Sequence, residues 1–386
     1  MPSLARGLFP ALVAIFALGC GSSATKSSNT SGGAGAGGVR NMSGSGAADG
    51  GRTGSLPCTI APDASVHWVG RVDGCDERGA RFAWSGSGFV GRFSGTGVSV
   101  RLIDSPNQYT VLIDAQLLDT LKTRSGDALY PLASDLSPGE HTFEMYRRTE
   151  ASFGNTIVVG FEVAGGELLS PPEPPTRHIE VIGDSITCGY GDEGTLPCGF
   201  SADTENHYLS YAAILARDLN AELSTVAWSG KGVIFNYNGD PLYPMPTQYA
   251  LTVPDDKKNT WPFAWKADAV VINLGTNDYS TSNDPSDTMF VDAYTLLLER
   301  VRGAYPNAFV LCTVGPLLTG ADRATARKNI AAAVDARTAA GDTKLKAYEM
   351  TTLNGTPPGC DYHPNLATQA AMASELEMEL RADLGW

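Results

Sequence analysis

The residues best suited to chemistry in this sequence fall in four short polar segments. Ser185 lies in "VIGDSITCGYG", residues 181–191, between an apolar stretch and a glycine-rich one. The other three segments are "WSGKG" at 228–232, "NLGTND" at 273–278 and "GCDYHPN" at 359–365. Gly-Asp-Ser alone is ordinary turn chemistry. Together, however, the segments offer a hydroxyl, a glycine backbone, an amide and an imidazole, the set that acyl transfer requires.

Each segment supplies one part of that chemistry. We predict that Ser185 is the nucleophile and that His363 is the base that takes its proton. The backbone N–H of Ser185, a glycine N–H of the second segment and the side-chain amide of Asn277 would stabilise the oxyanion. Glycine suits this role because an acyl oxygen can approach its backbone closely.

The four other histidines are weaker candidates for the base. His67 and His141 lie in strand-like sequence of the N-terminal half. His178 begins the strand that ends before Ser185, and His207 opens a helix, where we expect a surface or capping residue.

An α/β pattern positions the four segments. Apolar strand-like runs alternate with amphipathic runs of helical spacing, which indicates a parallel sheet covered on both faces. Ligands of such sheets bind beyond the carboxyl ends of the strands. The predicted strands are 179–185, 221–230, 268–275, 308–316 and 344–350, and the predicted helices are 207–221, 290–305, 324–341 and 365–386.

Residues 57–172 have a different pattern of apolar and polar residues. Short apolar or alternating runs with turn residues between them predict an antiparallel β-sandwich. In one run Val98, Val100 and Leu102 share a face. The proline-rich stretch 170–177 ends this region because proline interrupts helix and sheet alike, so the second domain is placed at 173–386.

The first 56 residues are read as export signals. Residues 1–20 have the basic start, apolar run and small-residue end of a signal peptide, and "ALGC" resembles a lipobox in which Cys20 would carry lipid. Residues 21–56 are rich in Gly, Ser, Ala and Thr, which predicts a flexible tether. The protein would then be exported and held at a bacterial membrane, or otherwise secreted.

Composition limits the partners. The chain has 386 residues and a formal net charge of −14. This charge disfavours nucleic acid and anionic lipid, so lipid on Cys20 would be the only link to a membrane. No cysteine pair has zinc-ligand spacing and there is no HExxH motif, so we predict neither metal nor cofactor. We expect a monomer.

The seven cysteines predict disulfides in an exported protein. If Cys20 carries lipid, six remain, and six allow about 15 connectivities. Pairing neighbours along the chain gives Cys58–Cys75, Cys188–Cys198 and Cys312–Cys360.

The four blocks resemble a known family. "GDSI", Ser229-Gly230, "GTND" and "DYHPN" are similar, in this order, to the motifs of SGNH (GDSL-type) hydrolases over residues 178–386. The resemblance implies a flavodoxin-like three-layer domain, here preceded by a jelly-roll sandwich, and it favours Gly230 over Gly232 in the oxyanion hole. The α/β-hydrolase fold is disfavoured because no G-x-S-x-G elbow stands at a strand-to-helix turn.

Together with the sandwich, "SGKG" and "GCDYHPN" resemble carbohydrate esterase family two more narrowly. This resemblance implies removal of acetyl groups from polysaccharides such as xylan and glucomannan. Trp228, Tyr279 and Tyr362 adjoin the motifs and are candidates to bind a sugar face, with ordinary core packing as the alternative. The alternative functions are a lipase or arylesterase with the same machinery, and a carbohydrate-binding protein.

Three acidic residues adjoin the motifs, and the sequence predicts different roles for them. Asp184 and Asp278 are expected to cap turns with their carboxylates. The family usually places an aspartate three residues before the histidine, where this sequence has Cys360 and carries Asp361 one place later. Either Asp361 reaches His363 and completes a triad, or a backbone carbonyl orients the ring and leaves a dyad. We favour contact between Asp361 and His363.

Overall fold

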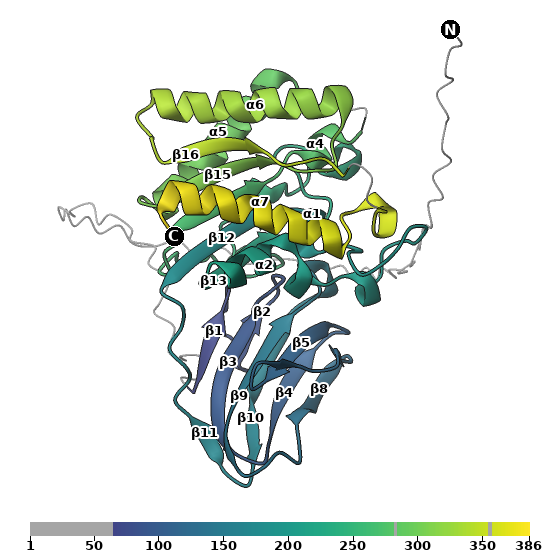
Figure 1. Ribbon diagram of the computed structural model, residues 1–386, viewed down its shortest axis with the longest axis vertical. Helices are drawn as coiled ribbons and strands as arrows, with labels where there is room; N and C mark the ends of the chain where they lie inside the picture. The colour runs from purple at the N-terminus through teal and green to yellow at the C-terminus, as the bar shows by residue number, and fades with distance from the viewer. Residues whose placement is uncertain (1–64, 282–283, 354–356) are drawn as a thin grey trace, which may run out of the picture. The chain divides into compact units, whose positions relative to one another are not determined.

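The computed structural model describes residues 65–281, 284–353 and 357–386. The predicted signal peptide, Cys20, the tether and Cys58 lie outside these ranges. Within them, no helix combines the length and the apolar character needed to cross a membrane. Two antiparallel sheets come first in the chain, and one parallel sheet follows (Figure 1).

The two antiparallel sheets enclose one apolar core. Phe89, Phe143 and Phe161 meet edge to face within it. Val98, Val100 and Leu102 are all buried there, as their alternation predicted. One sheet has the order β1 (Val66–Val69), β3 (Gly88–Gly95), β9 (Gly139–Arg147), β5 (Gln108–Ile113) and β6 (Gln116–Leu117), with β11 (Glu167–Leu169) beside β3 and β7 (Leu121–Lys122) beside β5. The other has the order β2 (Ala80–Phe82), β10 (Thr156–Ala164), β4 (Gly97–Asp104) and β8 (Gly126–Ala133).

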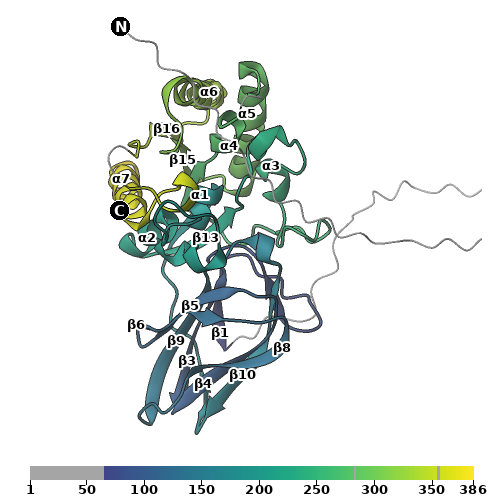
Figure 2. The same ribbon diagram turned by 90° about the vertical axis from the view of Figure 1, so that its right-hand side faces the viewer.

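The third sheet is parallel and has helices on both faces (Figure 2). Along its second strand, Ile179 and Val181 pack on one helix pair and Ile182 packs on the other. Its order is β13 (Ala221–Ala227), β12 (Arg177–Gly183), β14 (Ala269–Asn273), β15 (Phe309–Val314) and β16 (Leu345–Glu349). One face carries α2 (Tyr211–Asp218) and α7 (Leu366–Leu384), and the other carries α5 (Asp287–Ala304) and α6 (Gly320–Ala339).

Side-chain caps set the starts of two of these helices. The Ser286 side chain accepts from Met289 N before α5, and Asn365 accepts from Thr368 N at 3.0 Å before α7. The remaining short elements lie in connections: α1 (Ser185–Cys188), α3 (Met245–Gln248), α4 (Thr276–Tyr279), and the 3₁₀ turns η1 (Ala151–Phe153), η2 (Ala202–Thr204), η3 (His207–Leu209), η4 (Tyr237–Gly239) and η5 (Cys360–Tyr362).

A buried arginine fastens the sandwich to the parallel sheet. Arg71, which follows β1, donates to Glu180 Oε2 of β12 at 3.1 Å and to the carbonyl oxygen of Leu251 at 3.0 Å. Its guanidinium also lies 5.0 Å from the ring centre of Tyr249. A buried charge is tolerated only where hydrogen-bond acceptors and an opposite charge surround it. The Arg71 contacts therefore hold the sandwich against the parallel sheet in one arrangement.

Candidate active site

Ser185 stands where β12 turns into a single helical turn. Asp184 caps that turn, because its Oδ1 accepts from Ile186 N at 3.1 Å. Ser185 is the first residue of α1 and is almost completely buried. The strand end therefore presents the hydroxyl at the carboxyl edge of the sheet, where the sequence predicted it.

His363 contacts the Ser185 hydroxyl. Its Nε2 lies 2.8 Å from Ser185 Oγ, and its Nδ1 lies 3.1 Å from the backbone carbonyl oxygen of Asp361. A carbonyl oxygen can only accept, so Nδ1 carries the proton and Nε2 is free to accept from the serine. Burial lowers the pKa of His363, which favours the neutral ring. This is the arrangement of a general base beside a nucleophile.

The prediction that the Asp361 carboxylate contacts His363 is wrong. Oδ2 of Asp361 instead accepts from the Tyr190 hydroxyl at 2.7 Å and from Phe200 N at 3.1 Å. Asp361 has φ 48°, a left-handed conformation that turns its carbonyl oxygen toward the ring and its side chain elsewhere. In this structure a peptide carbonyl orients the histidine.

Tyr190 is a residue that the sequence reasoning missed. Its ring stacks on His363 with centroids 4.1 Å apart, and Phe200 stacks on Tyr190 at 4.4 Å. The Asp361 carboxylate thus acts on the histidine through an intermediate ring, by holding the tyrosine. The signal available was an aromatic residue between two glycines in the nucleophile segment.

One disulfide holds the loop that carries His363. It joins Cys198 to Cys360, with Cα atoms 4.7 Å apart. Gly194 lies against this bridge, and a Cβ on Gly194 would come within 2.1 Å of Cys360 Sγ. Glycine at this position therefore allows the 189–206 connection and the histidine loop to approach each other closely.

The predicted pairs Cys188–Cys198 and Cys312–Cys360 are wrong, since Cys188 and Cys312 are buried free thiols. Cys312 lies inside β15 and packs in the core on the α5 and α6 face. Cys188 ends α1, and its thiol faces Glu150. The predicted Cys58–Cys75 pair involves a residue outside the described ranges.

The second and third segments meet beside Ser185. Trp228 to Lys231 form a tight turn closed by a 3.2 Å bond from Lys231 N to Trp228 O, and Gly230 in it has φ 77°. Asn277 in α4 donates its amide to Lys231 O at 2.9 Å and to Asp184 Oδ2 at 3.3 Å. The amide thereby links the glycine turn to the cap of the serine helix.

Asp184 and Asp278 hold turns, as predicted. Besides Ile186 N, Asp184 receives the Asn277 amide, and burial raises its pKa to about 7. Asp278 accepts three backbone N–H groups, and burial raises its pKa as well. The three donors lie 2.8 to 3.0 Å away and belong to Val233, Ile234 and Phe235.

The aromatic candidates do not share one environment. Tyr279 is wholly buried against Phe290, and its hydroxyl accepts from Asn329, so its predicted role at the substrate is wrong. Trp228 is half-buried under the Lys231 ammonium group. Two tyrosines stand open near the motifs: Tyr362 is 63% exposed, and Tyr237, which the sequence reasoning missed, is 55% exposed.

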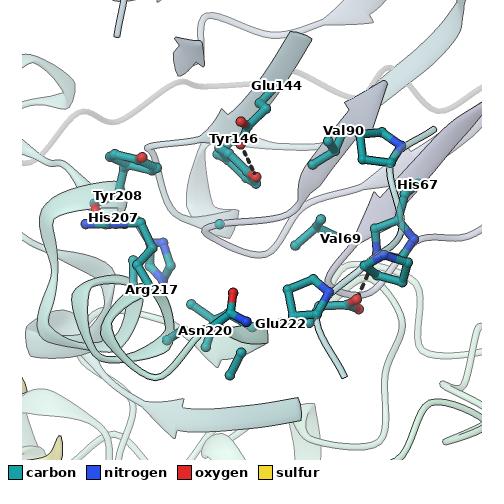
Figure 3. A pocket seen from close by; sticks show the side chains of 18 of the residues that line it. His67, Val69, Val90, Glu144, Tyr146, His207, Tyr208, Arg217, Asn220 and Glu222 are labelled. Carbon is teal, nitrogen blue, oxygen red and sulfur yellow. Dashed lines mark hydrogen bonds and ion pairs between the residues drawn. The ribbon is translucent and has the colours of Figure 1, made fainter. Parts of the chain in front are cut away.

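A separate cavity of about 290 Å³ lies where the sandwich meets α2 and β13 (Figure 3). Its walls contain none of the predicted site residues. Two pairs of its polar groups bond within the walls, namely His67 with Glu222 at 2.8 Å and Tyr146 with Glu144 at 2.6 Å. His207 is a buried wall residue bonded to Thr225, so its predicted surface or capping role is wrong.

One buried group of potential metal ligands occurs among the described residues. It consists of Glu150, Cys188 and Glu205, whose ligand atoms lie within 4.8 Å of one another. These atoms already engage in hydrogen bonds: Glu150 Oε2 accepts from Ser229 N and from the Cys188 thiol, and Glu205 Oε2 accepts from Glu150 N. We describe the group as a hydrogen-bonded network.

The fold and site define a GDSL-type carboxylic ester hydrolase domain with a sandwich before it. Residues 181–371 match the family described as GDSL-like Lipase/Acylhydrolase, and residues 68–172 match Carbohydrate esterase 2 N-terminal. The chain belongs to carbohydrate esterase family 2, and the predicted family is confirmed.

Several relatives are similar to most of this chain. A family two carbohydrate esterase from Clostridium thermocellum, solved in complex with cellohexaose, is 39% identical with a TM-score of 0.81, over 83% of this chain and 99% of that one. The cellulase/esterase CelE of Acetivibrio thermocellus is 40% identical over 83% of this chain, which spans only 40% of CelE. An acetylxylan esterase/glucomannan deacetylase of Cellvibrio japonicus is 26% identical over 84% of this chain and 91% of its own length.

Proposed function

We propose that this protein is a serine esterase that removes O-acetyl groups from polysaccharides of the xylan or glucomannan type. The observation that carries the proposal is the 2.8 Å contact between Ser185 Oγ and the unprotonated Nε2 of His363. The names of two relatives support the substrate class, since one is a glucomannan deacetylase and another was solved with cellohexaose.

The reaction would proceed through an acetyl-enzyme. Ser185 Oγ bonds to the acetyl carbonyl carbon while its proton passes to Nε2 of His363. The bond to the sugar oxygen then breaks, and His363 gives the proton to that oxygen. Water attacks the acetyl group with His363 again as base, which releases acetate and restores the serine hydroxyl.

Three donors would stabilise the oxyanion of each tetrahedral intermediate: the backbone N–H groups of Ser185 and Gly230, and the amide of Asn277. The 3.3 Å bond from Asn277 to Asp184 is the longer of its two bonds. The acyl oxygen would compete for this hydrogen, while the bond to Lys231 O keeps the amide in place.

We propose that Ser185 and His363 act as a dyad. The Asp361 carbonyl fixes the tautomer of His363, which is the first task of a triad acid. The Tyr190 ring, stacked on the imidazole, would support the imidazolium that forms in the transition state.

Exposed aromatic rings would bind the sugar. Tyr362 precedes His363 in the loop of residues 359–363, the base loop, and its ring is exposed. Tyr237, also exposed, donates its backbone N–H to Gly230 O at 2.8 Å and so lies beside the turn of residues 228–231, the oxyanion turn. The half-buried Trp228 begins the same turn. Flat apolar faces suit the face of a pyranose ring.

We also propose a fold type for each of the two domains. The strands β12 to β16, counted 1 to 5 along the chain, lie in the order 2-1-3-4-5 across the parallel sheet, which supports a flavodoxin-like domain at 173–386. The two antiparallel sheets support a jelly-roll sandwich at 57–172. From the sequence alone we propose export through residues 1–20, a lipid on Cys20 and a monomeric state.

Acetate release from acetylated xylan, glucomannan and peptidoglycan, beside p-nitrophenyl esters of rising chain length, tests the function. We expect activity on the first two polysaccharides and on esters of about two carbons. Ser185→Ala should lower kcat by about 10⁴ or more with an unchanged Tm, because the hydroxyl is the nucleophile. Activity within tenfold of wild type in that variant, or preference for long acyl chains, would overturn the proposal.

A further inference from the structure

Glu150 belongs to the sandwich, yet its side chain ends in the catalytic domain. It follows β9 and is the residue before η1. The residue is almost completely buried, and burial raises the pKa of its carboxyl group. Neither the four sequence motifs nor the reaction described above uses this residue.

One oxygen of Glu150 contacts two of the three elements that carry the proposed oxyanion donors. Oε2 accepts from the backbone N–H of Ser229 at 2.6 Å and from the Cys188 thiol at 3.7 Å. Ser229 precedes Gly230 in the oxyanion turn. Cys188 is the last residue of α1, the helical turn that Ser185 begins.

The geometry of the oxyanion turn explains how the Ser229 contact can affect the Gly230 N–H. Gly230 is the third of the four turn residues and has φ 77°, while Ser229 before it is outside the left-handed region. These are the features of a type II turn. The central peptide of such a turn carries the Gly230 N–H, and the peptide before it carries Ser229 N. Anchoring Ser229 N therefore fixes the neighbouring peptide and limits how far the central peptide plane can rotate.

The backbone of Glu150 is itself held in place by one residue of each domain. Its backbone N–H donates to Glu205 Oε2 at 3.2 Å, and its carbonyl oxygen accepts from the fully buried Arg147 guanidinium at 2.9 Å. Its backbone is therefore anchored on both sides, and the side chain extends from a fixed base to a fixed target.

We propose that Glu150 is a positioning residue through which the sandwich sets the geometry of the oxyanion hole. The inference rests on the proposed function, in which Ser185 and Gly230 donate to the acyl oxygen. The required property is the reach of an acceptor oxygen to Ser229 N, and the negative charge is dispensable.

A matched pair of variants separates reach from charge. Glu150→Gln keeps the length and an acceptor oxygen but removes the charge. Glu150→Asp keeps the charge but shortens the side chain by one methylene. Displacing a donor by about 1 Å can cost about 10²-fold in rate. We therefore expect kcat to fall about 10- to 100-fold in the Asp variant and less than about threefold in the Gln variant, with KM within about twofold in both.

The assays are kcat and KM on p-nitrophenyl acetate, the rate of inactivation by diethyl p-nitrophenyl phosphate, and Tm. The inactivation places a phosphoryl oxygen in the oxyanion hole without a sugar, so its rate should fall in parallel with kcat in the Asp variant. Lys122→Ala is the control, because it removes an exposed ion pair with Asp203 between the same two regions. Its kcat and inactivation rate should equal those of wild type.

Each result decides the inference. Wild-type kcat in the Asp variant would overturn it, and so would a larger loss in the Gln variant than in the Asp variant. A fall in Tm with unchanged kcat would assign Glu150 to folding alone and also overturn it. Ser185→Ala distinguishes failure of the proposed function from failure of the Glu150 inference. If Ser185→Ala stays active, the proposed function fails. If it is inactive, the results above test the role of Glu150 alone.

Discussion

The base and the oxyanion hole are held in different ways. The His363 loop, residues 359–363, is fixed within the catalytic domain by the Cys198 bridge and by the Tyr190 ring. The oxyanion turn, residues 228–231, is held by the Asn277 amide and by Glu150 of the sandwich. The direct contacts of the His363 loop therefore come from one domain, whereas the oxyanion turn is held by contacts from two.

The largest effect should come from the oxyanion side. Asn277→Ala removes one proposed donor and also releases the Lys231 carbonyl. We expect kcat to fall by about 10²–10³, roughly 3–4 kcal/mol of transition-state stabilisation, with a smaller change in KM. Asn155→Ala, which removes an exposed bond to Asp255, is the control and should keep wild-type kcat. A defect confined to KM would make Asn277 a substrate-binding residue.

A smaller effect is expected where the base loop loses its covalent tie. Replacing Cys198 and Cys360 together by serine should lower the free energy of unfolding by about 2–5 kcal/mol, since the bridge closes a long loop. The kcat value should fall about tenfold because His363 is less well placed. Denaturant titration and steady-state kinetics measure the two changes.

Cys312→Ala provides the matched control for the disulfide variant. It removes a buried free thiol of β15 that packs in the core on the α5 and α6 face. This variant should lose some stability and keep its kcat. If the disulfide variant also keeps wild-type kcat, then the stacked rings and hydrogen bonds hold the loop without the bridge, and the base side is even more independent than we infer.

The sequence predicted those features that depend on local pattern. The period-2 alternation at Val98 to Leu102 predicted a buried strand face, and it holds because one sheet face packs on the core. Helical spacing predicted α5 and α7 to within about three residues at each end. The expectation that polar groups gather at parallel strand ends correctly placed Ser185 beside His363.

Features that depend on distant contacts were missed. Pairing cysteines by sequence order failed because Cys198 and Cys360, 162 residues apart, meet only once the sheet is assembled. Tyr279 adjoins a motif, but α4 turns its ring into the core. Glu150 carries no motif, and its contact with Ser229 exists only because the sandwich packs against the catalytic domain.

The smallest effect should be the loss of the acid beside the base. A triad acid contacts the imidazole and stabilises its charged form, and losing it costs about 10⁴ in kcat. Asp361 makes no such contact, since its Oδ2 binds Tyr190 and Phe200 N. In Asp361→Asn the amide oxygen can still accept from both, and asparagine tolerates the φ of 48° at this position. We therefore expect kcat within about threefold of wild type.

The matched variant Asp361→Ala distinguishes the carbonyl from the side chain. Alanine keeps the backbone carbonyl that orients His363 but releases the Tyr190 hydroxyl, and it is strained at a left-handed φ. We expect a loss of about tenfold in kcat, as the stacked tyrosine becomes free to move. Steady-state kinetics of both variants decide between the two arrangements. A loss near 10³ in the asparagine variant would mean that the carboxylate reaches His363 during turnover, and the base side would then be a triad that forms only with substrate bound.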